Sequence, residues 1–139
     1  EMPFLAGLGA FFLAHIAYIA VFVLEGGPLK LVEEPWRLAI AAMLLAHATW
    51  MGTKLAKAVP PALKIPVFAY IAVISLMGIA AAAYGSLVIL TGALLFALSD
   101  TMLAAAKFIV SETDARQSAL KSGLWITYVA AQALILIGF

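Results

Sequence analysis

Long apolar stretches alternate with short segments of charged residues, proline and glycine along the whole chain. A helix needs about 20 mostly apolar residues to cross the hydrocarbon core of a bilayer. Five stretches reach this length, at residues 4–24, 36–55, 62–83, 86–110 and 121–139. The pattern therefore predicts an all-α fold, a polytopic transmembrane helical bundle with five spans, in a single domain that covers residues 1–139.

The segments between the predicted spans contain residues that start or stop helices. Residues 25–28 close the first span, and residues 33–35 precede the second. Pro60 and Pro61 precede the third span, and Pro66 lies in or near its first turn, where a missing backbone amide is tolerated. Because these connections are short, we expect neighbouring helices to pack antiparallel as a bundle.

The composition is that of a membrane protein. Of the 139 residues, 66% are hydrophobic and 11% are charged, whereas soluble domains are about 45–50% apolar and about 25% charged. So few charges could not cover a soluble surface, and membrane lipids are the expected surroundings. The net charge of +1, without a block of like charges, argues against nucleic acid as a partner. The lack of cysteine in the sequence excludes disulfides, thiolate metal sites and a cysteine nucleophile.

Basic residues gather on one side of the predicted bundle. That side carries Lys54, Lys57, Lys64, Lys107, Arg116 and Lys121, whereas the other carries only Lys30 and Arg37. Loops rich in lysine and arginine are retained in the cytoplasm. We therefore expect the first side to be cytoplasmic, the carboxyl end to lie outside, and the protein to reside in a bacterial inner (plasma) membrane.

Asp100 is an acidic residue in the middle of an apolar span. An aspartate near a helix centre costs about 2.5–3.5 kcal/mol on insertion scales, and acids that persist there usually line a site or a pathway. A purely structural hydrogen-bonding role is the alternative. His15, His47 and Gln132 lie within about one helical turn of the midplane in other spans. Because each must face the bundle interior, we expect a buried polar layer.

Neighbouring polar residues share helix faces with this layer. Tyr18 follows His15 by three residues, and Tyr128 precedes Gln132 by four. Lys107 follows the acid by seven residues and returns to its face. Ordinary packing with a satisfied hydroxyl is the alternative for both tyrosines, and we interpret His47 as a packing residue.

Three ordered segments resemble a known family. They are FLAGLGAFFLAHIAYIAVF at residues 4–22, GALLFALSDTMLAAAKF at residues 92–108, and TYVAAQALILIGF at residues 127–139. Their order and spacing resemble the YhhN-like lysoplasmalogenase family of multi-pass membrane proteins. The positions that carry the match include His15, Tyr18, Gly92, Ser99, Asp100, Lys107, Tyr128 and Gln132.

The sequence departs from the family pattern at its start. Family members have a Gly-Asp pair on the helix just before the one that carries His15 and Tyr18, whereas this sequence begins there with EMPF. The resemblance therefore implies an incomplete copy that lacks about three spans, each of about 20 residues, together with a second acid.

The resemblance implies a hydrolase that cleaves the vinyl ether bond of a lysophospholipid, giving a fatty aldehyde and a glycerophospho head-group alcohol. It implies that Asp100 is the general acid or the carboxylate that stabilises the cationic intermediate. His15 and Tyr18 would orient water or relay protons. The expected substrate-binding residues are Tyr128, Gln132, Ser99 and Lys107. We expect no cofactor and no metal.

Other classes of function also fit a polar layer at the midplane. A small transporter or proton-coupled carrier would place Asp100, His15 and Gln132 there. In a lipid-binding or assembly subunit, the same layer would only fix helix register. A zinc hydrolase is disfavoured because two dispersed histidines and one aspartate barely provide three ligands.

Overall fold

The computed structural model describes residues 2–26 and 29–139, which form helices and short connections. Within these residues, five helices are long and apolar enough to cross a membrane. They are α1 (Met2–Gly26), α3 (Pro35–Ala58), α4 (Pro61–Tyr84), α5 (Leu87–Ala104) with its extension η1 (Ala105–Ile109), and α6 (Arg116–Gly138). The all-α transmembrane fold is thus confirmed, and the chain is a multi-pass integral membrane protein.

The helix ends follow the proline and glycine residues of the sequence. Pro35 and Pro61 occupy the first turns of α3 and α4, where the missing amide has no intrahelical acceptor to lose. Gly85 ends α4 with a φ of +106°, a left-handed conformation that favours glycine. Ser86 then caps α5, because its hydroxyl accepts the backbone N–H of Ile89 at 3.2 Å. These residues fix the sharp turn between α4 and α5.

One expected connection contains a helix of its own. The segment between the first two spans was expected to be only a link, but Leu29–Glu33 forms the short helix α2. α2 contacts both α3 and α4. The link is therefore long enough to carry the chain away from α1 before α3 begins.

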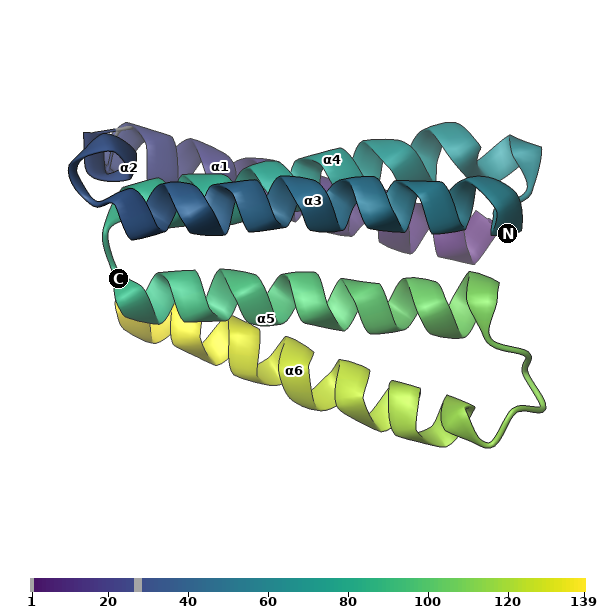
Figure 1. Cartoon of the computed structure of the whole chain (residues 1–139). Coiled ribbons are helices and arrows are strands. Elements are labelled where there is room, and N and C mark those ends of the chain that lie inside the picture. The colour runs from purple at the N-terminus through teal and green to yellow at the C-terminus, as the bar shows by residue number, and fades with distance from the viewer. Residues whose placement is uncertain (1, 27–28) are drawn as a thin grey trace.

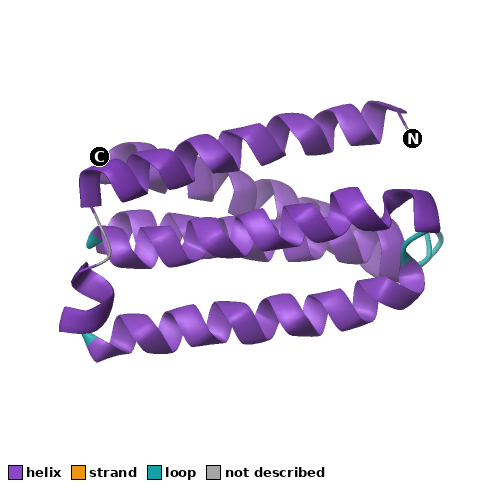
Figure 2. Ribbon diagram, turned by 90° about the horizontal axis from the view of Figure 1, so that it is seen from above, coloured by secondary structure: helices purple, strands orange, loops and turns teal. Residues whose placement is uncertain are grey.

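The helix α4 lies at the centre of the arrangement. It packs against α1, α3 and α5, and α6 packs along α5. Figure 2 shows helices throughout and loops at the two ends of the molecule. The expectation that all chain neighbours pair was wrong for α1, which packs against α4 and runs in the same direction as that helix (Figure 1). The tight turns at residues 59–60 and 85–86 enforce antiparallel pairs, whereas the connection with α2 does not.

The two ends of the bundle differ in charge. The start of α1, the α3–α4 turn and the loop at residues 110–115 lie at one end, and α2, the α4–α5 turn and the carboxyl terminus lie at the other (Figure 1). The first end, which we call the basic end, carries most of the lysine and arginine residues. Its cytoplasmic location stays a prediction.

Gly92 allows the close approach of α5 and α6. A Cβ atom at this position would lie 2.8 Å from Ile135 Cγ1 and 3.0 Å from the Ala131 carbonyl oxygen. We expect Gly92→Ala to lower the free energy of unfolding by about 1–3 kcal/mol, because the helices must separate. Denaturation of the purified protein in detergent measures this. The control is Gly9→Ala, since nothing lies within 4 Å of that position; equal stability of the two variants would contradict the tight contact.

Candidate functional site

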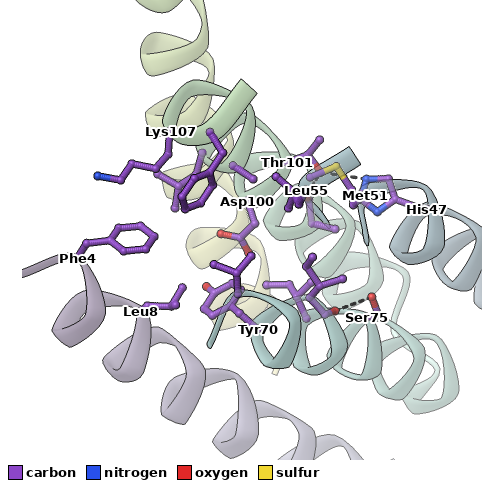
Figure 3. Close-up of a pocket in the computed structure, with 17 residues that line it drawn as sticks. Phe4, Leu8, His47, Met51, Leu55, Tyr70, Ser75, Asp100, Thr101 and Lys107 are labelled. Carbon is purple, nitrogen blue, oxygen red and sulfur yellow. Dashed lines mark hydrogen bonds between the residues drawn. The ribbon is translucent and has the colours of Figure 1, made fainter. Parts of the chain in front are cut away.

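A cavity of about 60 Å³ lies beside Asp100, between α1, α3, α4 and α5 (Figure 3). We call it the Asp100 cavity. Its walls are mostly apolar, and its lining includes Phe4, Leu8, His47, Met51, Leu55, Tyr70, Ser75, Asp100, Thr101 and Lys107. Since one water needs about 10–15 Å³ of such volume, the cavity has room for a few waters or for a short part of a larger substrate.

Asp100 presents a carboxyl oxygen that has no hydrogen-bond partner among residues 2–26 and 29–139. Its Oδ2 atom is buried and makes no hydrogen bond within the described residues. The Tyr70 side chain, which is 7% exposed, approaches the same carboxyl group from α4. A buried polar atom without a partner is costly. An unpaired carboxyl oxygen against an apolar cavity is therefore a feature that a bound water or substrate would relieve.

His47 and Thr101 link α3 to α5 at the edge of the cavity. The Thr101 hydroxyl donates to the Ala97 carbonyl oxygen at 2.7 Å and lies 3.0 Å from His47 Nε2. A hydroxyl has only one hydrogen, and that of Thr101 is given to Ala97. The Thr101 oxygen must therefore accept a hydrogen bond from His47 Nε2, which carries the imidazole proton. His47, interpreted from the sequence as a packing residue, thus makes a specific hydrogen bond and lines the cavity.

A second polar group joins α1 to α6. The Tyr18 hydroxyl donates to Gln132 Oε1 at 2.8 Å, and Gln132 Nε2 donates to the Tyr128 hydroxyl at 3.3 Å. We call this set the Tyr18 network. Its three members hydrogen-bond to one another, as intramembrane polar groups tend to do. None of the three lines the Asp100 cavity.

His15 lies between the Tyr18 network and Tyr70. Its side chain is 1% exposed, its Nδ1 is 2.6 Å from the Phe11 carbonyl oxygen, and its Nε2 is buried without a partner. Because only a ring N–H can bond to a carbonyl oxygen, Nδ1 is the donor. The imidazole packs edge-on against the rings of Tyr70 and Phe96, at 5.6 and 5.1 Å. Tyr70 therefore contacts His15 with its ring and faces Asp100 with its hydroxyl.

The polar residues thus form two groups instead of the single layer that we expected. Asp100 and Lys107 line the Asp100 cavity, whereas the residues outside it are His15, Tyr18, Ser99, Tyr128 and Gln132. The reason is visible on α5. Ser99 lies two turns from Gly92, which faces α6, and its hydroxyl donates to the Phe96 carbonyl oxygen at 2.9 Å. Asp100, one position later, is rotated by about 100° toward the other helices.

The end of α5 is a π-helical turn. In η1 the backbone hydrogen bonds join residues that are five apart instead of four. Such π-helical turns are rare, and those that occur are frequently found at functional sites. Gln117, at the start of α6, bonds to the carbonyl oxygens there: its Nε2 donates to those of Ala106, Val110 and Ser111 at 2.9, 3.0 and 3.2 Å. This π-turn carries Lys107, whose Nζ lies 4.8 Å from the centre of the Phe4 ring.

Sequence reasoning missed three polar residues of the cavity, namely Tyr70, Ser75 and Thr101. Tyr70 and Ser75 are buried polar residues near the middle of α4. A tyrosine at the centre of an otherwise apolar span was the available signal. No group of three histidine, aspartate or glutamate residues that could hold a metal ion occurs in residues 2–26 and 29–139.

Comparison with known proteins gives a consistent result. The model of the YhhN family matches residues 1–139. Proteins named lysoplasmalogenase from Mycobacterium bovis and Mycobacterium tuberculosis are each 35% identical to the chain over 144 aligned positions. The alignments cover 98% of the chain and 51% of each relative, so the chain spans about half the length of these curated relatives. No solved structure matches the chain.

Proposed function

Because the chain belongs to the YhhN family over its full length, we propose that it is part of a membrane-embedded hydrolase that cleaves the vinyl ether bond of a lysoplasmalogen. The products are a fatty aldehyde and a glycerophospho head-group alcohol. The names of the two mycobacterial relatives support this assignment. The observation that carries it in this chain is the unpartnered Asp100 oxygen beside an apolar cavity.

The chemistry of a vinyl ether requires what Asp100 can provide. The slow step in the hydrolysis of a vinyl ether is the transfer of a proton to the vinyl carbon that is not bonded to oxygen. This transfer leaves an oxocarbenium ion centred on the vinyl carbon that is bonded to oxygen. A protonated carboxyl group donates this proton, and the resulting carboxylate lies beside the cation, as in glycoside cleavage. Water then attacks the cationic carbon and returns a proton to the carboxylate. The hemiacetal that forms collapses to the aldehyde and the alcohol, so the residue is regenerated.

The size and polarity of the cavity suit this step. Its volume of about 60 Å³ admits the vinyl ether bond and a water, but not a whole lipid. The mostly apolar walls lower the local polarity, which strengthens the electrostatic effect of the carboxylate on the cation. Tyr70 and the His47–Thr101 pair line the same cavity and offer polar groups that would orient the attacking water.

We assign the Tyr18 network and His15 a positioning role. The network fastens α1 to α6, and the His15 imidazole packs against the ring of Tyr70. His15 and Tyr18, expected to orient water or relay protons, do not line the Asp100 cavity. Tyr128, Gln132 and Ser99, expected to bind substrate, likewise do not line the cavity.

An isotope experiment tests the proposed reaction. The complete protein, supplied with a purified lysoplasmalogen in deuterium oxide, should release an aldehyde that carries deuterium on the carbon next to the carbonyl group, because that carbon receives the proton. The matched saturated alkyl ether should release nothing, since it has no vinyl carbon to protonate. Movement of the lipid across sealed vesicles without any aldehyde would contradict the proposal and favour the carrier.

A further inference from the structure

A second hollow lies at the basic end, between η1 and α6. It measures about 640 Å³ and is lined by parts of α5, η1, the loop after it and α6. We call it the α6 groove. Figure 1 shows α6 diverging from α5 toward the loop that joins them, which opens this space. Ligand sites typically measure about 300–1,000 Å³, so the groove is large enough for a lipid head group and its glycerol backbone.

Two lysines supply the positive charge of the groove. Lys107 and Lys121 line it from η1 and α6, and neither forms an ion pair in the described part of the chain. The nearby Arg116 is instead engaged by Asp114, at 3.0 Å, and this contact holds the pKa of Asp114 at about 2. Lys121 can therefore bind an anion in the groove directly, whereas the Lys107 ammonium, which lies 4.8 Å from the centre of the Phe4 ring, must turn from that ring on its flexible stem to reach the anion.

Gln117 gives the groove wall an acceptor. Its side chain is 7% exposed and lines the groove. Its Nε2 donates to three carbonyl oxygens in η1 and just after it, whereas its Oε1 is buried and has no partner among the described residues. A hydroxyl group that donates to Oε1 would satisfy it. Lysines beside an unsatisfied acceptor suit a ligand that carries both a phosphate and a hydroxyl.

The α6 groove adjoins the Asp100 cavity. Leu103 and Lys107 line both spaces. Lys107 lies seven residues after Asp100, which corresponds to about 10 Å along a helix, and the flexible lysine stem shortens the gap to a ligand. Given the lysophospholipid substrate proposed above, we propose that the α6 groove binds the phosphate of that lipid through Lys107 and Lys121 while the ether bond lies at Asp100.

The test measures binding separately from hydrolysis. The probes are a 1-alkylglycerol 3-phosphate and the matching 1-alkylglycerol, two saturated ethers that lack the vinyl bond and differ only in the phosphate. The complete protein should bind the first about tenfold or more tightly than the second, the effect of a charge-assisted contact. The double variant Lys107→Gln, Lys121→Gln should bind both equally. Lys54→Gln removes a charge from the exposed surface at the same end and should behave as wild type.

Removing a negative charge from the groove provides a second test of the proposed phosphate site. Glu112 lines the same groove, so Glu112→Gln should tighten binding of the phosphate probe and leave the phosphate-free probe unchanged. Equal losses for both probes in the lysine variant, or weaker phosphate binding in Glu112→Gln, would overturn the site. If inorganic phosphate displaced the phosphate probe at a similar concentration, the groove would be a site for free phosphate, and the proposal that it binds a lipid phosphate would be wrong.

The experiments distinguish failure of the phosphate site in the α6 groove from failure of the proposed reaction. If the lysines discriminate the probes but no lysoplasmalogen is cleaved, the reaction is wrong and the site stands. If cleavage proceeds with an unchanged KM in the double lysine variant, the site is wrong and the reaction stands.

Discussion

Asp100→Asn in the complete protein is expected to lower the rate of aldehyde release from a lysoplasmalogen by about 10²–10⁴-fold, the usual contribution of a general acid. Asparagine has nearly the same shape and still offers an oxygen toward the cavity. It has no acidic proton to give to carbon, and it carries no negative charge to stabilise the oxocarbenium ion. The loss should therefore appear in kcat more than in KM.

This variant needs evidence that the fold survives. Asp100 makes no hydrogen bond through Oδ2, so asparagine should leave the unfolding temperature and the elution profile unchanged or slightly improved. Glu33→Gln is the matched control, because it changes an exposed acid to its amide in α2, at the end of the bundle opposite the basic end. Aldehyde release by Asp100→Asn near the wild-type rate would remove this residue from the mechanism.

The helices were readable from the sequence because the bilayer imposes a length on each apolar stretch. Pro35 and Pro61 also marked individual helix starts, because of their restricted backbone. The partner of α1 was not readable. Local chemistry sets where a helix ends, whereas the choice of α4 over α3 depends on side-chain packing and on a connection that folds into α2.

The sequence predicts the depth of the polar residues but not the direction in which they point. Counting residues predicts that Asp100 and Gln132 lie near the same level of the membrane. The direction in which a side chain points around its helix has a structural meaning only when the neighbouring helices are known. Since α6 occupies the Gly92 face of α5, Asp100 points to α4 and meets Tyr70 there, while Gln132 pairs with Tyr18. The solitary acid was conspicuous in an apolar span, and a tyrosine was not.

Arg37 is a buried cation at the end of the bundle opposite the basic end, and its loss is expected to have the largest effect on stability. Its side chain is 3% exposed. The guanidinium donates to the carbonyl oxygens of Ala82 and Gly85 at 2.7 and 3.1 Å, and to Glu34 Oε2 at 3.0 Å. The last carbonyls of a helix have no intrahelical donor. Arg37 therefore ties the end of α4 to the start of α3.

Arg37→Met should lower the free energy of unfolding by about 2–3 kcal/mol, because hydrogen bonds to a charged group are lost and their carbonyl partners stay buried. Methionine retains much of the aliphatic stem, so packing changes little. Lys30→Met is the control at the same end: its ion pair with Glu33 is 3.4 Å long and exposed, and such pairs contribute about 0–1 kcal/mol. Equal unfolding free energies for the two variants in detergent would contradict the role of Arg37.

Acid should reduce the difference between Arg37→Met and wild type. The hydrogen bond from Arg37 lowers the pKa of the Glu34 carboxyl from its ordinary value of 4.5. A group with a lowered folded-state pKa contributes stability that is complete above the ordinary pKa and is lost as the pH falls through the lowered one. The Glu34 part of the effect should therefore persist at neutral pH and vanish in strong acid, whereas the part from Ala82 and Gly85 should remain. A difference that grows on acidification would refute this division of roles.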